Sequence, residues 1–130
     1  MSSYAYGCMI VVIPIEHIGE FERLFDQDYE KSFLNTEIKL TDIEDAGIAG
    51  HQKRIYDFSC NTSLEACLIE NEDYDIGDVC FELGIVELDI DAINIEEDFN
   101  ESIKFDKNEG ICHYDSVEQK WRKTSYDLNL

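Results

Sequence analysis

One stretch without lysine or arginine, Ile55 to Ile103, constrains the fold most strongly. It holds fifteen acidic side chains in forty-nine residues, yet large apolar residues such as Phe81, Leu88 and Ile90 are interspersed with them. An acidic segment stays disordered when it has too little apolar surface to bury. Here the apolar positions are numerous enough for one face to be buried while another presents carboxylates. The stretch is therefore expected to form a folded acidic surface.

The whole chain is strongly acidic. Thirty acidic residues against ten basic ones give its 130 residues a formal charge of -20 at pH 7, while hydrophobic residues still make up 44%. That composition supplies an ordinary core, and two cores of half the length would both be marginal, so we expect a single domain over residues 1–130. A negative field of this size repels nucleic acid and anionic lipid and attracts positively charged proteins. Direct binding of nucleic acid is not expected.

The five cysteines are odd in number, and no two of them have the two-residue spacing of a zinc or redox motif. The N-terminal residues also lack the basic and apolar regions of a secretory signal. We therefore expect buried free thiols and a cytoplasmic protein. The longest apolar run, Cys8 to Ile15, is too short to cross a bilayer as a helix, so no membrane segment is expected.

The first half of the chain predicts the order strand, helix, strand, strand. Tyr6 to Ile15 is apolar without polar interruption, which is typical of a central strand buried on both faces. Apolar spacings of three and four predict a helix from Glu16 to Lys31. Alternating patterns predict two further strands, at Thr36–Ile43 and Lys53–Cys60.

The second half predicts mainly strands. Leu64 to Leu68 is expected to form a short helix, with a strand as the alternative. Val79 to Ile90 is expected to be sheet, with Gly84 marking a bulge or a turn between two strands. Short alternating runs separated by polar turns predict a C-terminal β-meander, and these runs are Ser102–Phe105, Ile111–Tyr114 and Lys120–Tyr126.

Together these patterns predict an α+β fold in a single domain. The sheet is expected to be mixed or antiparallel, with one clear helix at residues 16–31, space for a second short one, and the β-meander at the end. This element order is compatible with a ferredoxin-like split arrangement, although other topologies share the same order.

No pattern points to catalysis. His17, His51 and His113 are the three imidazoles, and none of them has a cysteine or carboxylate at the spacing of a nucleophile or metal motif. Asn71, Asp73, Asp75 and Glu82 fall on ligand positions of a calcium-binding loop, but Ile76 occupies the place that requires glycine. We therefore expect no enzyme activity, no cofactor and no dedicated metal site.

The acidic residues themselves are the candidate binding site. In a strand, Glu87, Asp89 and Asp91 share one face at intervals of about 6.6–6.8 Å, because successive side chains alternate between faces. That is roughly half the charge density of a DNA strand, so such a row begins to imitate a line of phosphates. The complete set of candidate partner-binding residues is Glu70, Glu72, Asp73, Asp75, Asp78, Glu87, Asp89, Asp91, Glu96, Glu97 and Asp98.

The leading hypothesis is a non-enzymatic inhibitor that binds a basic protein, with carboxylates in place of phosphates. Two kinds of small acidic protein act in this way: immunity proteins against nuclease toxins, which we place first, and phage-encoded inhibitors of CRISPR or restriction systems. A structural or assembly subunit of a phage or secretion system, and a small metal-dependent enzyme, are the alternatives. Residues 110–130 carry three acidic and three basic side chains, so this neutral end is a second candidate interface. The oligomeric state stays open.

Overall fold

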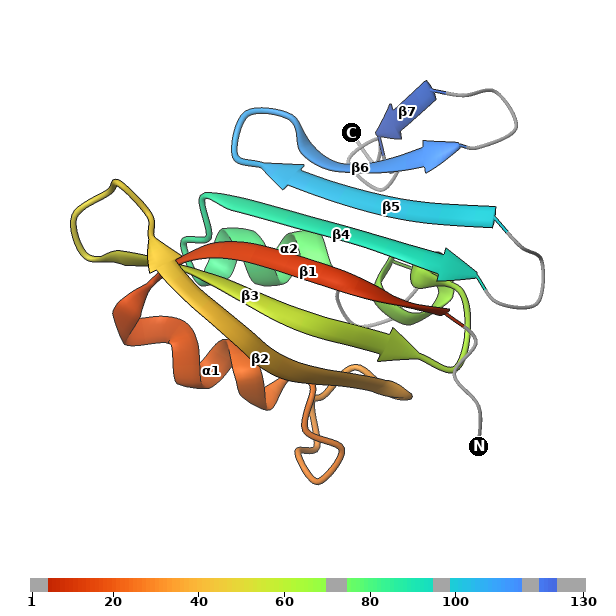
Figure 1. The fold of residues 1–130 in the computed structure, drawn as a ribbon, viewed down its shortest axis with the longest axis horizontal. Helices are drawn as coiled ribbons and strands as arrows, with labels where there is room; N and C mark the ends of the chain where they lie inside the picture. The colour runs from red at the N-terminus through yellow and green to blue at the C-terminus, as the bar shows by residue number, and fades with distance from the viewer. Residues whose placement is uncertain (1–4, 70–74, 95–98, 116–119, 124–130) are drawn as a thin grey trace.

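An antiparallel sheet of seven strands forms the framework of the protein (Figure 1). The computed structural model describes residues 5–69, 75–94, 99–115 and 120–123. The strands are β1 (Ala5–Pro14), β2 (Thr36–Asp45), β3 (His51–Cys60), β4 (Glu87–Asn94), β5 (Phe99–Asp106), β6 (Gly110–Asp115) and β7 (Lys120–Lys123). Their order across the sheet is β2-β3-β1-β4-β5-β6-β7. With a few short helices beside the sheet, the fold is α+β.

Strand β1 pairs along almost its whole length with β3 on one side and β4 on the other, so its predicted central position is confirmed. The predicted burial of both its faces is wrong, because Tyr6 and Cys8 are exposed. Its odd-numbered residues from Ala5 to Ile13 point toward the helices, and Met9, Val11 and Ile13 are completely buried. Gly7 lies in the same row, and its lack of a side chain lets the Asp91 carbonyl of β4 approach closely. The two central strands therefore depend on a glycine at this position.

The first helix is shorter than the sequence pattern predicts. A 3-10 turn, η1 (Ile15–His17), leads into α1 (Ile18–Arg23), and the expected continuation to Lys31 is wrong. The N–H groups of Leu24, Phe25 and Asp26 each bond a carbonyl three residues back, which tightens the helix end. The chain must then reverse, because Phe25 and Phe33 pack together with ring centroids 5.7 Å apart.

The side chain of Gln27 holds this reversal in place. Its Nε2 donates to the carbonyls of Phe33 and Thr36 at 3.1 and 3.0 Å, and its Oε1 accepts from the N–H of Asn35 at 3.0 Å. The Phe33 N–H also donates to the Leu24 carbonyl at 2.7 Å. These bonds satisfy backbone groups of the turn between α1 and β2 that regular secondary structure leaves unpaired.

A second helix, α2 (Ile76–Glu82), replaces the first third of the strand predicted at Val79–Ile90. Asp75 caps its start: its Oδ1 accepts from the Asp78 N–H at 2.8 Å, and Asp78 Oδ2 accepts from the Asp75 N–H at 3.1 Å. Gly84, with φ +67°, ends it, so this glycine terminates a helix and is not a bulge between strands. Only the last third of the predicted run, residues 87–90, is sheet, as part of β4.

The segment predicted as either a short helix or a strand at Leu64–Leu68 is helical. It forms η2 (Glu65–Ile69), a single wide turn of π-helix that follows β3. Cys67, Leu68 and Ile69 are buried in it. A turn of this kind places three consecutive residues against the core, which the tighter α-helix does not do as readily.

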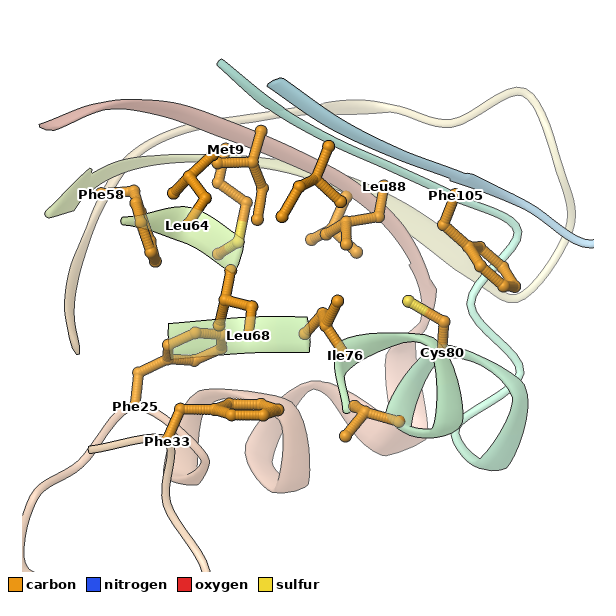
Figure 2. Close-up of a cluster of buried hydrophobic side chains, with 14 of the residues drawn as sticks. Met9, Phe25, Phe33, Phe58, Leu64, Leu68, Ile76, Cys80, Leu88 and Phe105 are labelled. Atoms are coloured by element: carbon orange, nitrogen blue, oxygen red, sulfur yellow. The ribbon is translucent and has the colours of Figure 1, made fainter. Parts of the chain in front are cut away.

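The helices cover one side of the sheet, and the core lies between the two layers (Figure 2). Met9 and Leu88 reach down from the strands, while Leu68, Ile76 and Cys80 reach up from η2 and α2. Phe25 and Phe33 fill the end of the core below Phe58. The opposite side of the sheet carries no helix within the described ranges (Figure 1).

The last four strands follow one another across the sheet. Each of β4, β5 and β6 pairs antiparallel with the next strand in the chain. The predicted run Lys120–Tyr126 is described only as far as Lys123. None of the helices in the described part of the chain has the length and apolar character needed to span a membrane.

Candidate functional site

The helix-free side of the sheet is called the open face below. Cross-strand neighbours point to the same side of a sheet, so the register of the strands assigns its residues. Its central members on β1, β3, β4 and β5 are Tyr6, Cys8, Ile10, Ile55, Asp57, Glu87, Asp89, Asp91, Ile93, Ser102 and Lys104. The open face therefore combines apolar side chains in its middle with carboxylates on both sides of them.

Strand β4 supplies the row of carboxylates that the sequence predicts. Leu88, Ile90 and Ala92 are buried toward the helices, while Glu87 and Asp91 are exposed and Asp89 is half-buried. The alternation expected for residues 87–91 is thus present. Ser102 on β5 donates a hydrogen bond to Asp91 Oδ1, which fixes that carboxylate within the row.

A thiol lies between two carboxylates at the centre of the open face. Cys8 on β1 is directly opposite Asp57 on β3 and opposite Asp91 on β4. Partial burial raises the pKa of the Cys8 thiol, and the negative charges of Asp57 and Asp91 raise it further. The thiol is exposed but stays protonated at neutral pH, so the negative charge here comes from the carboxylates.

Asp89 is the carboxylate of the row whose surroundings least favour its ionised form. Its Oδ1 is buried and has no hydrogen-bond partner among the described residues. Burial raises the pKa of Asp89, and nearby Glu87 raises it further against the lowering effect of Lys104. A hollow of about 360 Å³ between β4, β5 and β6 is lined by Glu87, Asp89, Lys104 and Cys112, among others. The ionised form of Asp89 is therefore less stable in the fold than in water.

Replacing Asp89 by asparagine is expected to stabilise the free protein at pH 7. Protonation of Asp89 is favoured in the folded state, so the wild type gains stability as the pH falls through the raised pKa, and the asparagine variant does not. The advantage of the variant should thus be largest at pH 7 and vanish below about pH 4, the range of an unperturbed aspartate. Urea unfolding of the wild type and the variant, at pH 7 and below about pH 4, measures this difference in stability.

The matched control is Asp28→Asn, in the exposed turn after α1, which should change the free energy of unfolding by less than about 0.5 kcal/mol. An equal shift in both variants would show that the relief of net charge, and not the position of Asp89, is responsible.

Two exposed apolar side chains join the acidic row. Tyr6 and Ile93 are cross-strand neighbours on β1 and β4, with 50% and 45% of their surface exposed. Neither residue was predicted as a binding residue from the sequence, because both lie in apolar runs, which are typical of buried strands. A signal was present, since Tyr6 and Ile93 are out of phase with the buried residues Met9 and Ile90 of the same strands. Tyrosine is enriched at interface hot spots.

The other predicted acids divide into two groups. Asp75 and Asp78 form the capping box of α2, and Asp75 is only 5% exposed, so both have a structural role at the start of this helix. Six candidates lie outside the described residues: Glu70, Glu72, Asp73, Glu96, Glu97 and Asp98. Of the predicted set, the structure brings together Glu87, Asp89 and Asp91.

Two buried thiols meet where β3 leads into η2. Cys60 donates to the Thr62 carbonyl at 2.9 Å, and Cys67 Sγ lies 2.7 Å from Thr62 Oγ1. The hydrogen bond from Cys60 lowers the pKa of Cys67, and the Thr62 hydroxyl lowers it further. Both thiols are more than nine-tenths buried, so a substrate in solution does not reach them.

Comparison with known proteins gives no family. No protein-family model matches the chain, and no curated protein or solved structure is significantly similar to it. Within the described ranges, no group of three or more histidine, cysteine or carboxylate side chains is arranged to hold a metal ion. The chemistry that remains on the open face is that of an acidic surface with an exposed aromatic residue.

Proposed function

We propose that the protein is a non-enzymatic inhibitor that binds a basic protein through the open face. The partner is a nuclease toxin or another protein whose natural ligand is nucleic acid, and the inhibitor acts in the cytoplasm as an immunity protein. This proposal rests on charge and geometry, because within the described ranges the face carries no helix and most of its charged side chains are acidic.

The single observation that carries the proposal is the regular row on β4. Glu87, Asp89 and Asp91 project from one side of a strand whose other side is anchored by the buried residues Leu88 and Ile90. Such a strand holds its carboxylates about 6.6–6.8 Å apart without further support. Positive groups that are spaced to bind phosphates can pair with a row of this kind.

The unfavourable state of Asp89 fits this role. One oxygen of the half-buried Asp89 carboxylate has no hydrogen-bond partner among the described residues, which lowers the stability of the free protein, and a cationic side chain from a partner would relieve this cost. Tyr6 and Ile93 add apolar surface at one end of the row, which charge alone does not provide. An interface with an aromatic anchor and a charged periphery agrees with the usual anatomy of protein–protein contacts.

The regular spacing also supports the second candidate, a phage-encoded mimic of nucleic acid that inhibits a CRISPR or restriction system. The two candidates differ in their partner and share the same surface.

We further propose that β1, α1, β2, β3, α2 and β4 form a ferredoxin-like unit, which a C-terminal meander extends. The strand order β2-β3-β1-β4 supports this topology.

Neutralising the row should weaken partner binding about 10- to 100-fold, since each exposed ion pair contributes up to about 1 kcal/mol. The test variant is Glu87→Gln/Asp89→Asn/Asp91→Asn. The partner is first captured from the source cells with the wild-type protein, identified, purified, and then titrated calorimetrically. Wild-type affinity should fall steeply with salt, because charges are screened beyond about 8 Å at 0.15 M.

A variant with the same change of three charges on the α1 side, Glu16→Gln/Asp28→Asn/Glu30→Gln, serves as the control. All three control residues are exposed. The control should retain near wild-type affinity. If both variants bind the partner equally well, the open face is not the interface, and the proposed function loses its structural basis.

A further inference from the structure

Among the described strands, β2 is an outer strand of the sheet and pairs only with β3 (Figure 1). Apart from Thr36 and Ile38 at its start, its residues are exposed. The outer side of such a strand presents backbone N–H and C=O groups that a further strand can pair with. The Gln27 side chain already donates a hydrogen bond to the Thr36 carbonyl at 3.0 Å, so the free edge of β2 begins after Thr36.

A hollow of about 460 Å³ lies beside this edge, on the helix side of β2. Its apolar walls are Ile38 and Leu40 from β2, Tyr56 from β3, and Phe25 from the turn after α1. Leu40 is 38% exposed, whereas Tyr56 is 1% exposed. If a further strand paired with β2, every second side chain of that strand would lie on the helix side of the sheet. One of these side chains would point into the hollow.

Some of the polar side chains at the rim of the hollow pair with one another. Arg54 Nη2 contacts Glu22 Oε2 at 3.0 Å, and the Tyr56 hydroxyl donates to the same oxygen at 2.8 Å. Arg54 therefore neutralises Glu22. Asp26 accepts a hydrogen bond from the Asp28 N–H at 3.0 Å but has no cation beside it in the described part of the chain.

The other side of β2 is also acidic. Glu37, Asp42 and Glu44 point to the open face with Lys39, and among the residues that the structure describes only Glu44 has an ion pair there, with Lys53 at 3.6 Å. Both sides of the edge therefore favour a segment that carries positive charge.

We propose that the edge of β2 binds an extended, basic segment of a partner protein as an additional strand, with one apolar side chain of that segment in the hollow beside Leu40. Main-chain hydrogen bonds would hold the segment, and the hollow and the acidic rims would select its side chains. The inference deepens the proposed function, on which it rests for the positive charge of the partner.

The shape of β2 limits where the segment lies. The register with β3 shifts between Leu40 and Asp42, and the Thr41 hydroxyl donates to the Ile55 carbonyl at 3.0 Å. A bulge of this kind bends the strand and interrupts regular pairing. The regular pairing is therefore centred on Glu37 to Leu40, which borders the hollow and Asp26, and a segment that continues past the bulge comes alongside Asp42 and Glu44.

The test uses the purified full-length protein and short fluorescent peptides in about 0.15 M salt, where long-range charge effects are screened. One peptide alternates lysine with valine, a second has the same composition in scrambled order, and a third is the alternating peptide methylated on every second backbone nitrogen. The alternating peptide should bind at least about tenfold more tightly than the other two. Hydrogen exchange should slow at the β2 amides when it binds.

Two variants with the same gain of charge locate the site. Leu40→Lys fills the mouth of the hollow and should weaken the alternating peptide about tenfold, whereas Ile15→Lys, in η1 and 54% exposed, should leave its affinity unchanged. Because the methylated peptide is tested on the wild-type protein, the result does not depend on how well either variant folds.

Equal binding of the alternating and scrambled peptides would overturn the proposal, as would a loss in Ile15→Lys that matches the loss in Leu40→Lys. The second result would show that the added charge, and not the hollow, weakens binding, and it would leave the proposed function intact. Protection of β2 that rises with protein concentration alone would assign the edge to a second copy of the chain, which also overturns the proposal.

Discussion

Gly7→Ala is expected to destabilise the protein by about 3 kcal/mol or more, toward the upper end for overpacked sites. A Cβ atom at this position would clash with the Asp91 carbonyl oxygen and lie 2.7 Å from the Cα of Ala92. Both are backbone atoms of β4, so no side chain can rotate away. The strands β1 and β4 would have to separate at the centre of the sheet. Urea unfolding followed by circular dichroism measures the loss.

Gly19→Ala is the matched control for this substitution. Gly19 lies in α1, and a Cβ atom there would meet no other atom within 4 Å. Alanine favours a helix by about 0.5–1 kcal/mol over glycine, so this variant should be more stable than the wild type. If Gly7→Ala unfolds at the same urea concentration as the wild type, the close approach of β1 and β4 is incorrect.

Leu68→Ala should lower the free energy of unfolding by about 2–5 kcal/mol, because it leaves a cavity that rigid neighbours do not fill. Leu68 is completely buried in η2 and lies near Phe25 and Phe33, below Met9 (Figure 2). This residue joins the helical layer to the sheet, so its loss affects both layers. Thermal and urea unfolding measure the change.

The same substitution at Leu34, which is 70% exposed, is the comparison. It should change the free energy of unfolding by less than about 0.5 kcal/mol. Similar effects at the two leucines would mean that η2 does not pack against the core in solution.

The strands were largely predictable from the sequence, because a period of two is a local property. Alternation places Glu87, Asp89 and Asp91 on one side of β4, and the unbroken apolar run of β1 identifies a central strand. These inferences need no knowledge of distant residues.

The helices were predicted less well, for two different reasons. The apolar pattern continues past Arg23, but tertiary contact between Phe25 and Phe33 turns the chain instead of extending α1. For α2, the apolar richness of residues 79–90 outweighed signals that were present in the sequence. Asp75 followed three residues later by Asp78 marks a helix start, and Gly84 marks its end.

The composition of the open face depends on strand order, which no local pattern contains. Asp57 and Asp91 are thirty-four residues apart in the sequence and become neighbours of Cys8 only because β1 lies between β3 and β4. Tyr6 and Ile93 are brought together in the same way. The acidic row was therefore predictable, and its partners across the sheet were not.

The position of Cys8 gives the open face an internal reporter of electric potential. The thiol is exposed and has a carboxylate on either side, so a cationic thiol reagent is attracted to it and an anionic reagent of similar size is repelled. The ratio of the two modification rates reflects the local potential at the centre of the sheet. Neutralising one neighbouring carboxylate at a time would then resolve how much of that potential each strand contributes.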